Sequence, residues 1–454
     1  MKIRFLLSLV AVVLLSACSG DDSSTDDGIT SVPNVVSTTP ANGATGIAVG
    51  TVNIAITYDG KVSLNNRENI SISGGNITNC ILSSGYTVLN ITAECATKGT
   101  TVVVTIPQGV ISNSAGSAAA YTLSFTTEEE PQPMQPTLSS TPVAATDASA
   151  TKLYAYLLEN YQKKILTGMM ANVAWNNEES EKVYKMTGKY PAINGYDYIH
   201  LPYSAEGSWI NYGDITPVKT WADNHGIVTI GWHWCVPSVE GGTDLGFYKK
   251  GSGGGNSETT FKIANAVTEG TWENQVVKAD MERIANYLKL LQKENIPVLW
   301  RPLHEASGGW FWWGAGTAEH CKKLWVMMFD YFKQQGLTNL IWVWTDDKAT
   351  WYPGDNYVDV VGCDAYGESV STCVAKYNEL QAAFSSKMIA LTECGYSDYS
   401  KQHIAGIADQ WQAGAKWSWF MPWYNVEKQA PSSWWDTFKN DPNIIWRLDV
   451  PNFK

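Results

Sequence analysis

The sequence lacks the patterns of several large enzyme classes. No two cysteines have the C-x-x-C spacing of a zinc site, and His304-Glu305 is not followed by the second histidine of a zinc protease motif. There is no G-x-S-x-G turn for a serine nucleophile, and the glycine-rich stretch near residue 251 lacks the lysine of a phosphate-binding loop. These absences exclude zinc proteolysis, serine-ester hydrolysis and phosphate-loop nucleotide binding.

Basic residues are in the minority. The 454 residues include 32 Lys and Arg against 44 Asp and Glu, which gives a formal net charge of −12. Nucleic acid needs a basic surface, so this balance argues against a nucleic-acid partner. A neutral polymer would be unaffected.

Cysteines are few and odd in number once the first is set aside. Of the eight, seven follow Cys18, so at least one thiol must stay unpaired in any intramolecular arrangement. Cys80 and Cys95 are the only two in the N-terminal domain and could join two of its strands. An oxidising compartment permits such a bond but does not require it.

The first residues predict export and a lipid anchor. Lys2 and Arg4 precede an apolar run that is too short to span a bilayer, and Leu15-Ser16-Ala17-Cys18 follows it. This pattern resembles the bacterial lipoprotein signal, in which the cysteine is acylated and becomes the new N-terminus. We therefore expect residues 1–17 to be a signal peptide and Cys18 to attach the protein to the outer membrane.

An acidic tether, residues 18–31, comes next. Its stretch SGDDSSTDDG is polar, with nothing to bury, and it resembles the surface-export signal of lipoproteins in Bacteroidetes. We expect exposure at the cell surface, and the periplasmic face stays open as an alternative.

Tryptophan divides the rest of the chain into two kinds of domain. All 21 tryptophans lie between Trp175 and Trp446, and the first 150 residues have none. Residues 32–127 instead contain short alternating runs such as VNIAITY, TTVVVTIP and YTLSFTT, which predict a small all-β sandwich. The segment resembles bacterial Ig-like domains, and we expect it to act as a spacer rather than to bind sugar.

After a proline-rich linker, residues 128–149, the pattern changes to alternating strands and helices. Eight apolar runs are visible in residues 150–454: KILTGMM, YPAINGYDYI, IVTIGWHW, IPVLWRPLHE, NLIWVWTDD, YVDVVGCDAY, KMIALTECGY and AKWSWFMPWY. Amphipathic stretches lie between them. This α/β pattern predicts a (β/α)8 TIM barrel, whose active site would lie at the carboxyl ends of the strands.

Two glutamates stand at such ends. The fourth strand finishes at His304-Glu305 and the seventh at Glu393, each after a run too apolar to tolerate an unpaired charge. Retaining glycosidases need two carboxyl groups roughly 5 to 5.5 Å apart, one as nucleophile and one as acid/base. The spacing along the barrel therefore predicts double displacement at a sugar.

Several motifs resemble glycoside hydrolase family 26 over residues 150–450. WRPLHEASGGWFWWG is similar to the acid/base motif of that family, and LTECGYS to its nucleophile motif. The resemblance implies that Glu305 is the acid/base and Glu393 the nucleophile, with His304 bracing the acid/base and binding sugar. It further implies that His233 reaches the sugar, that Tyr366 hydrogen-bonds the nucleophile, and that Trp310 and Trp423 are walls of the sugar pocket.

The family resemblance also implies a substrate. Mannan, galactomannan or glucomannan is expected, cut at β-1,4-mannosidic linkages without a metal or organic cofactor, by a monomer. β-1,3-Xylan and mixed-linkage β-glucan are the alternatives within the family. A non-enzymatic alternative is a surface lipoprotein that binds glycans without cleaving them. The presence of both Glu305 and Glu393 argues against it. Endo or exo action stays open.

Overall fold

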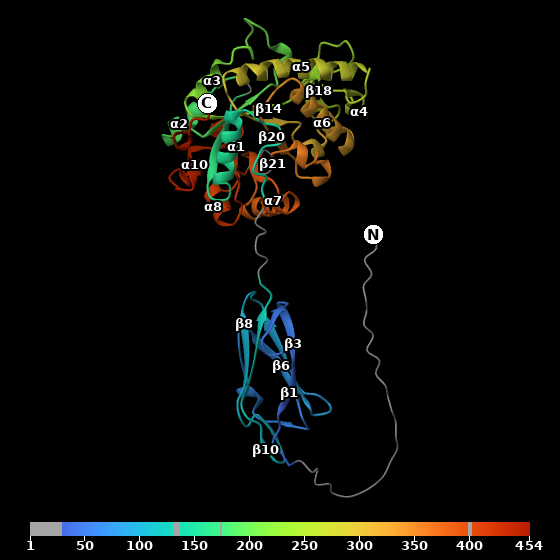
Figure 1. The fold of residues 1–454 in the computed structure, drawn as a ribbon, viewed down its shortest axis with the longest axis vertical. Coiled ribbons are helices and arrows are strands. Elements are labelled where there is room, and N and C mark those ends of the chain that lie inside the picture. Colours follow the sequence, from blue (N-terminus) through green and yellow to red (C-terminus); the bar gives the residue numbers. More distant parts are fainter. Residues whose placement is uncertain (1–29, 130–136, 173–174, 398–401) are drawn as a thin grey trace. The chain divides into compact units, whose positions relative to one another are not determined.

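The computed structural model describes residues 30–129, 137–172, 175–397 and 402–454 (Figure 1). The chain divides into two compact units, Met1–Met134 and Gln135–Lys454. Cys18 and the predicted signal peptide lie outside the described residues. Within the described ranges, no helix combines the length and the apolar character that crossing a membrane requires.

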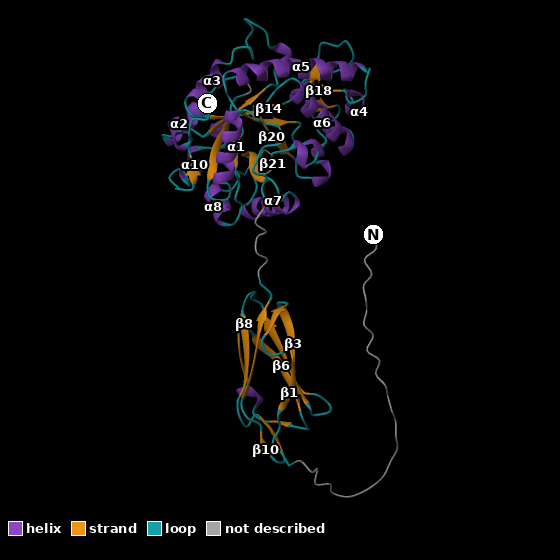
Figure 2. Cartoon of the chain, in the orientation of Figure 1, coloured by secondary structure: helices purple, strands orange, loops and turns teal. Residues whose placement is uncertain are grey.

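The N-terminal unit is an all-β sandwich (Figure 2). Its two four-stranded sheets have the orders β1-β3-β7-β6 and β2-β11-β8-β5, and β10-β9-β4 form a small third sheet. The strands are β1 (Val35–Thr39), β2 (Ala44–Ile47), β3 (Gly50–Tyr58), β4 (Ser63–Leu64), β5 (Ser71–Ser73), β6 (Asn76–Leu82), β7 (Val88–Cys95), β8 (Thr101–Ile106), β9 (Ile111–Asn113), β10 (Gly116–Ser117) and β11 (Tyr121–Thr127). The predicted sandwich is thus present.

Alternation along these strands builds the core. Ile54, Ile56, Leu89 and Ile91 face inward and are fully buried, while their neighbours face solvent. All seven cysteines of the described residues are free thiols, Cys80 and Cys95 among them. The disulfide considered from the sequence is therefore not formed, because Cys80 pairs across the strands with Ile91.

The C-terminal unit is the predicted (β/α)8 barrel. Its parallel strands are β12 (Ile165–Met170), β13 (Ile193–Asp197), β14 (Ile227–Trp232), β19 (Val298–Pro302), β20 (Leu340–Thr345), β21 (Val360–Tyr366), β22 (Met388–Gly395) and β23 (Trp419–Pro422). They follow one another around the sheet, and β12 pairs with both β13 and β23, which closes the barrel. A short β24 (Ile444–Ile445) adds to β12.

Helices surround these strands. They are α1 (Ala148–Asn160), α2 (Glu178–Thr187), α3 (Thr216–Asp223), α4 (Ile263–Ala266), α5 (Trp272–Lys293), α6 (Ala318–Gln334), α7 (Val370–Ala383), α8 (Ile407–Gln412), α9 (Val426–Gln429) and α10 (Ser432–Asp436). The long α5 and α6 are capped at their N-termini by Thr271 and Thr317, whose hydroxyls accept backbone N–H groups of the first turn. The loop between β14 and α5 carries four two-residue strands: β15 (Val236–Pro237), β16 (Leu245–Gly246), β17 (Tyr248–Lys249) and β18 (Glu258–Thr259).

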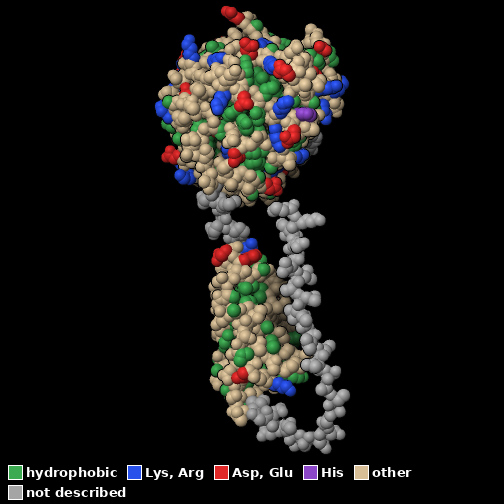
Figure 3. Space-filling model, turned by 45° about the vertical axis from the view of Figure 1, so that its right-hand side comes forward, with side chains coloured by type: hydrophobic (Ala, Val, Ile, Leu, Met, Phe, Trp, Pro, Cys, Tyr) green, Lys and Arg blue, Asp and Glu red, His purple; other side chains and the backbone are tan. Residues whose placement is uncertain are grey.

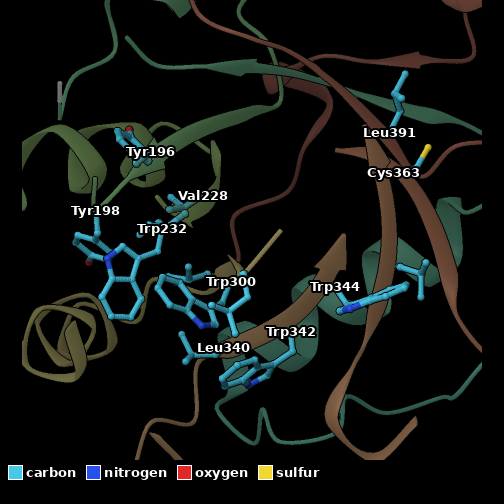
Figure 4. Close-up of a cluster of buried hydrophobic side chains, with 14 of the residues drawn as sticks. Tyr196, Tyr198, Val228, Trp232, Trp300, Leu340, Trp342, Trp344, Cys363 and Leu391 are labelled. Atoms are coloured by element: carbon cyan, nitrogen blue, oxygen red, sulfur yellow. The ribbon is translucent and has the colours of Figure 1, made fainter. Parts of the chain in front are cut away.

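Successive side chains of each barrel strand point to opposite faces, so the strands contribute to one core inside the barrel and another outside it. In β20, Ile341 and Val343 belong to the cluster inside the barrel, whereas Trp342 and Trp344 pack outward against the helices (Figure 4). The outward layer is rich in aromatic side chains, which explains most of the tryptophan content. Trp325, Trp342 and Trp344 are among its buried members.

The chain enters the barrel unit at the amino ends of its strands. Val143 N–H donates to Asp359 Oδ1 at 2.7 Å, just before β21, and Thr146 N–H donates to Thr338 O at 3.0 Å, just before β20. Side chains of α1, which follows, join the cluster inside the barrel. This end of the barrel is therefore closed, and the opposite end is the one available for a site.

Charged side chains of both signs are interspersed on the face of the barrel unit shown in Figure 3, with apolar side chains between them. Lysine and arginine do not gather into one patch on that face.

Candidate active site

The side chains predicted for the site lie at the carboxyl ends of five barrel strands. His233 directly follows β14, and Glu305 comes just after β19. Tyr366 ends β21, Glu393 lies near the end of β22, and Trp423 directly follows β23. Because parallel strands end at one rim of a barrel, residues far apart in the sequence meet here.

A β-bulge directs Glu393 into the barrel. In β22, Leu391 pairs with Cys363 of β21, but the next pair is Glu393 with Asp364, so Thr392 is an extra residue. Simple alternation from the outward-facing Leu391 would turn Glu393 outward as well. The extra residue turns the Glu393 side chain back into the barrel, and the Thr392 hydroxyl donates to Asp364 Oδ1 at 2.8 Å.

Glu393 is held from two sides. Tyr366 Oη donates to Glu393 Oε2 at 2.5 Å, and Arg301 Nη2 donates to Glu393 Oε1. Glu393 is only 4% exposed, so these charge-assisted bonds form away from water. Arg301 also lies 3.5 Å from Asp364 Oδ2. The arrangement gives each oxygen of a buried carboxyl group a donor and so fixes both oxygens.

Glu305 lies on a strained turn. Leu303 and Glu305 have φ angles of 51° and 53°, in the left-handed region that non-glycine residues rarely adopt. Glu305 N–H donates to Thr345 O at 3.0 Å, and Asp346 Oδ2 accepts Ser307 N–H at 2.7 Å. The loop after β19 is thus held by the end of β20, which turns the Glu305 side chain toward the barrel axis.

The carboxyl groups of Glu305 and Glu393 are close together. One oxygen from each, together with one from Asp364, lie within 4.8 Å of one another. Burial, followed by the negative charge of Glu393, raises the pKa of Glu305 to about 7. Glu305 can therefore hold a proton near neutral pH beside an ionised partner, which is the division of roles that a retaining glycosidase needs.

Asp364 is the third carboxyl group of this cluster. Burial and the charge of Glu393 raise its pKa well above the usual range, although Arg301 acts in the opposite direction. Among the described residues, Glu305, Asp364 and Glu393 form the one group with the spacing of metal ligands. Arg301 already donates to two of these carboxyl groups, so a guanidinium supplies the positive charge at this place.

His233 is fixed by a carboxylate from the neighbouring strand. Asp197, at the end of β13, accepts His233 Nδ1–H at 2.5 Å with Oδ2 and His233 N–H at 3.0 Å with Oδ1. Burial lowers the pKa of His233, but the charge and hydrogen bond of Asp197, together with the charge of Glu393, raise it above 6.5. With Nδ1 occupied by Asp197, Nε2 is the ring nitrogen left for a ligand.

His304 lies beside the nucleophile. Its Nε2 is 3.9 Å from Glu393 Oε1, and its ring centroid is 4.5 Å from that of His233. Burial, and then the Arg301 charge, lower the pKa of His304 well below its usual value, so the ring is neutral. Its Nδ1 has no hydrogen-bond partner among the described residues, which leaves that atom for a sugar hydroxyl.

Aromatic side chains border the carboxyl groups. Trp310 is 40% exposed, and its indole N–H donates to Glu305 Oε2 at 3.1 Å. Trp423 packs at a steep angle against His233, with ring centroids 5.6 Å apart. A cavity of about 430 Å³, a size typical of ligand sites, opens beside these groups and is lined by Glu305, Trp310, Asp364, Tyr366 and Lys376, among others.

The family profile described as Glycosyl hydrolase family 26 matches residues 142–444. The chain belongs to glycosyl hydrolase family 26. A second profile, described as Bacterial Ig-like domain, matches residues 29–127 and agrees with the sandwich.

Relatives of this family 26 chain include enzymes of known structure. The family 26 domain of an endo-β-mannanase/endo-β-glucanase from Prevotella bryantii is 41% identical, with a TM-score of 0.64 over 69% of this chain and 99% of that one. A β-mannanase from a symbiotic protist of the termite Reticulitermes speratus, complexed with gluco-manno-oligosaccharide, is 34% identical, with a TM-score of 0.59 over 69% and 98%.

A curated relative is the mannan endo-1,4-β-mannosidase of Thermothelomyces thermophilus. It is 36% identical over 286 residues, which are 61% of this chain and 55% of that protein. The family 26 chain spans about half the length of the first curated relatives it matches, with shares of 55%, 46% and 44%.

Two residues of the family 26 site were not predicted from the sequence. Asp197 and Asp364 both stand at strand ends, in INGYD and CDAY, where a polar side chain after an apolar run is a signal. The rule that selected Glu305 and Glu393 would have selected them too. Their importance is visible only from their partners, His233 for Asp197 and the two glutamates for Asp364.

Proposed function

We propose that this chain is a retaining glycoside hydrolase that cleaves β-1,4-mannosidic linkages in mannan, galactomannan or glucomannan. The observation that carries the proposal is the approach of Glu305 and Glu393 to within 4.8 Å at the open end of the barrel. Mannan specificity draws support from the relatives named as mannanases, which come from bacteria, fungi and a protist.

In the first step, Glu393 attacks the anomeric carbon while Glu305 protonates the departing glycosidic oxygen. The bond from the anomeric carbon to that oxygen breaks, and a glycosyl ester of Glu393 forms. Arg301 and Tyr366 hold the attacking carboxylate in place. The raised pKa of Glu305, about 7, lets it bring the proton.

In the second step, Glu305 removes a proton from a water molecule, whose oxygen attacks the anomeric carbon and releases Glu393. Formation of the ester removes the negative charge of Glu393, so one cause of the raised pKa of Glu305 is absent in the intermediate. Glu305 thereby becomes the base that this step needs. Two inversions at the anomeric carbon retain its configuration.

The test is reducing-sugar release from locust bean gum by the wild type, Glu393→Ala and the matched control Glu368→Ala. Glu368 lines the same cavity but pairs with Lys376 at 3.7 Å. We expect the control to stay active and Glu393→Ala to lose activity by roughly a thousandfold or more. Early products seen by proton NMR should be β-anomers. Binding without cleavage by the wild type would favour a glycan-binding lipoprotein, and cleavage of xylan or mixed-linkage glucan alone would change the substrate.

We further propose that Cys18 is acylated and that a monomer is held on the outer face of the outer membrane. The signal-like sequence before Cys18 and the acidic residues after it support this placement. Radiolabelled palmitate should enter the wild type but not Cys18→Ala. Digestion of the protein by protease added to intact cells would support the outer face, whereas protection would place it in the periplasm. Light scattering after gel filtration tests the monomer.

A further inference from the structure

Glu179 is a buried carboxylate that the reaction described above does not use. It lies in the first turn of α2, the helix that follows β12, and its side chain is only 3% exposed. Burying a carboxylate costs free energy unless hydrogen bonds replace the lost water. Lys182, one turn further along α2, donates to Glu179 Oε1 at 2.9 Å. The other oxygen, Oε2, is bonded outside α2.

The partner of Oε2 lies on the loop after β23. Val426 N–H, the first of α9, donates to Glu179 Oε2 at 2.7 Å, and both residues are buried. The first N–H groups of a helix have no partner within it, and the side chain of the preceding residue often supplies one. The preceding residue is Asn425, which makes no side-chain bond to the described residues of α9. Glu179 therefore caps α9 from another helix.

The turn before α9 needs such support. Asn425 has a φ angle of 68°, in the left-handed region, and its backbone oxygen accepts Gln429 N–H at 2.9 Å. With four residues, α9 is too short to be stable by itself. A second tie to α2 is the ion pair of Lys182 with Glu427 at 3.3 Å, but both of its side chains are exposed, so it contributes little. The buried bond of Glu179 is the stronger of these two ties.

The loop after β23 is also joined to the strand that carries the nucleophile. Gln429 Oε1 accepts the N–H of Tyr396, the residue that directly follows β22, at 2.9 Å. Trp423 N–H donates to the backbone oxygen of Cys394, next to Glu393, at 3.0 Å. This loop therefore connects α2 with the residues that follow the nucleophile.

Trp423 begins the same loop at the edge of the site. Its half-buried ring packs against His233, with ring centroids 5.6 Å apart. The strands β12 and β23 are neighbours in the barrel, with Leu166 paired to Trp419, so the loops after them leave the rim side by side. A displacement of α9 would therefore move an aromatic ring of the site together with the end of β22.

We propose that Glu179 and Gln429 are positioning residues that hold Trp423 and the end of β22 in place through α9. This rests on the proposed function, since the position of Trp423 beside Glu393 affects turnover only if a sugar is cleaved there. A wall that is fixed before the sugar arrives loses little freedom on binding. A nucleophile on a fixed strand end likewise keeps the geometry that attack requires.

The experiment is a double-mutant cycle between Glu179→Ala and Trp423→Ala in the full chain, with kcat/KM measured on mannan and on aryl β-mannobioside. Glu179→Gln is the conservative variant, because its amide oxygen can still accept Val426 N–H. Glu178→Ala is the matched control, since Glu178 is the neighbouring glutamate of α2 but is exposed. Melting temperatures are measured for every variant, and the assays are run well below the lowest of them.

We expect Glu179→Ala to lower kcat/KM by roughly tenfold, the scale of one lost charge-assisted bond. Glu179→Gln should retain most of the wild-type value, and the control should equal the wild type. In the Trp423→Ala background, Glu179→Ala should lower kcat/KM by less than about threefold, because the ring that it positions is absent. A full tenfold loss in that background would overturn the proposal. So would a lower melting temperature with wild-type kcat/KM, because Glu179 would then only stabilise the fold.

Gln429→Ala tests the second joint and decides the matter if Glu179→Ala does not fold. The Gln429 side chain is partly exposed, so its loss leaves no large cavity. Without the bond to Tyr396, kcat/KM should fall by roughly three- to tenfold. An unchanged value in Gln429→Ala would overturn the proposal.

Failure of the proposed function has a different appearance. If the wild type cleaves xylan or mixed-linkage glucan instead of mannan, the same cycle is measured on that polymer. If the wild type binds mannan without cleaving it, affinity gel electrophoresis with locust bean gum replaces the kinetics. Losses of binding that are smaller together than their sum would then support the action of Glu179 through Trp423, and additive losses would overturn it.

Discussion

The raised pKa of Glu305 offers a direct test of the site geometry. Burial is its larger cause and the charge of Glu393 the second. Replacing Glu393 with glutamine keeps the shape of the side chain and removes its charge. We therefore expect the pKa of Glu305 in Glu393→Gln to fall from about 7, but to remain above its usual 4.5, because burial persists.

The size of the fall follows from the distance. Two unit charges at most 4.8 Å apart, at an effective dielectric constant of about 20, interact by at least roughly 3.5 kcal/mol, equivalent to about 2.5 in pKa. Arg301 lies against Glu393 and offsets part of this charge. Because burial is also the larger cause, we expect a fall of about 1 in the pKa.

Carbon NMR of protein labelled at the glutamate carboxyl carbons measures the titration, and the Glu305→Gln variant assigns its signal. In the wild type, kcat/KM should fall as the pH rises through about 7, since only protonated Glu305 can donate to the leaving oxygen. A pKa that is unchanged or higher in Glu393→Gln would refute the reasoning, because the two carboxyl groups would then not share one site.

Three further outcomes are expected. Tyr366→Phe removes the bond to Glu393 and should lower kcat/KM by roughly ten- to a hundredfold, about 1.5–3 kcal/mol, in steady-state assays on mannan; an unchanged value would show that Arg301 alone positions the nucleophile. Asp197→Asn leaves one acceptor oxygen for the two N–H donors of His233, and it should lower kcat/KM about tenfold without changing the melting temperature. Full activity would contradict the view that Asp197 positions the His233 ring. Leu299→Ala leaves a cavity at a fully buried position inside the barrel and should lower the free energy of unfolding by about 2–5 kcal/mol. Unfolding is followed by tryptophan fluorescence, which reports on the barrel unit alone. A loss under 1 kcal/mol would mean that the interior collapses around the cavity.

The fold was predictable because its signals are local. Each barrel strand is an apolar run of strand length, and the long α5 and α6 have helical periodicity and capping threonines. Absence of tryptophan from the first 150 residues separated the two units. Less visible was the docking of residues such as Val143 onto the barrel, since a polar, proline-rich segment gives no sign of a partner more than 200 positions away.

The candidate site was predictable in its residues but not in its geometry. Position at a strand end selected Glu305 and Glu393, yet no local pattern announces the bulge at Thr392 that turns Glu393 inward. Nor does the sequence announce the left-handed backbone of Glu305, which depends on bonds to the next strand. Nor does the sequence indicate that the His304 ring lies near Glu393, with its Nε2 3.9 Å from Oε1; the bracing of Glu305 by His304 stays a prediction.

The route by which the chain joins the barrel has a practical consequence. Val143 and Thr146 fasten the incoming segment at the closed end of the strands, opposite the rim that carries the carboxyl groups. Coupling of the barrel unit through the segment that precedes Val143 therefore starts at the closed end and leaves the mouth of the barrel unobstructed. A biocatalyst immobilised in this way should retain its turnover on a viscous polymer, whereas coupling through lysines of the rim, such as Lys376, would block entry.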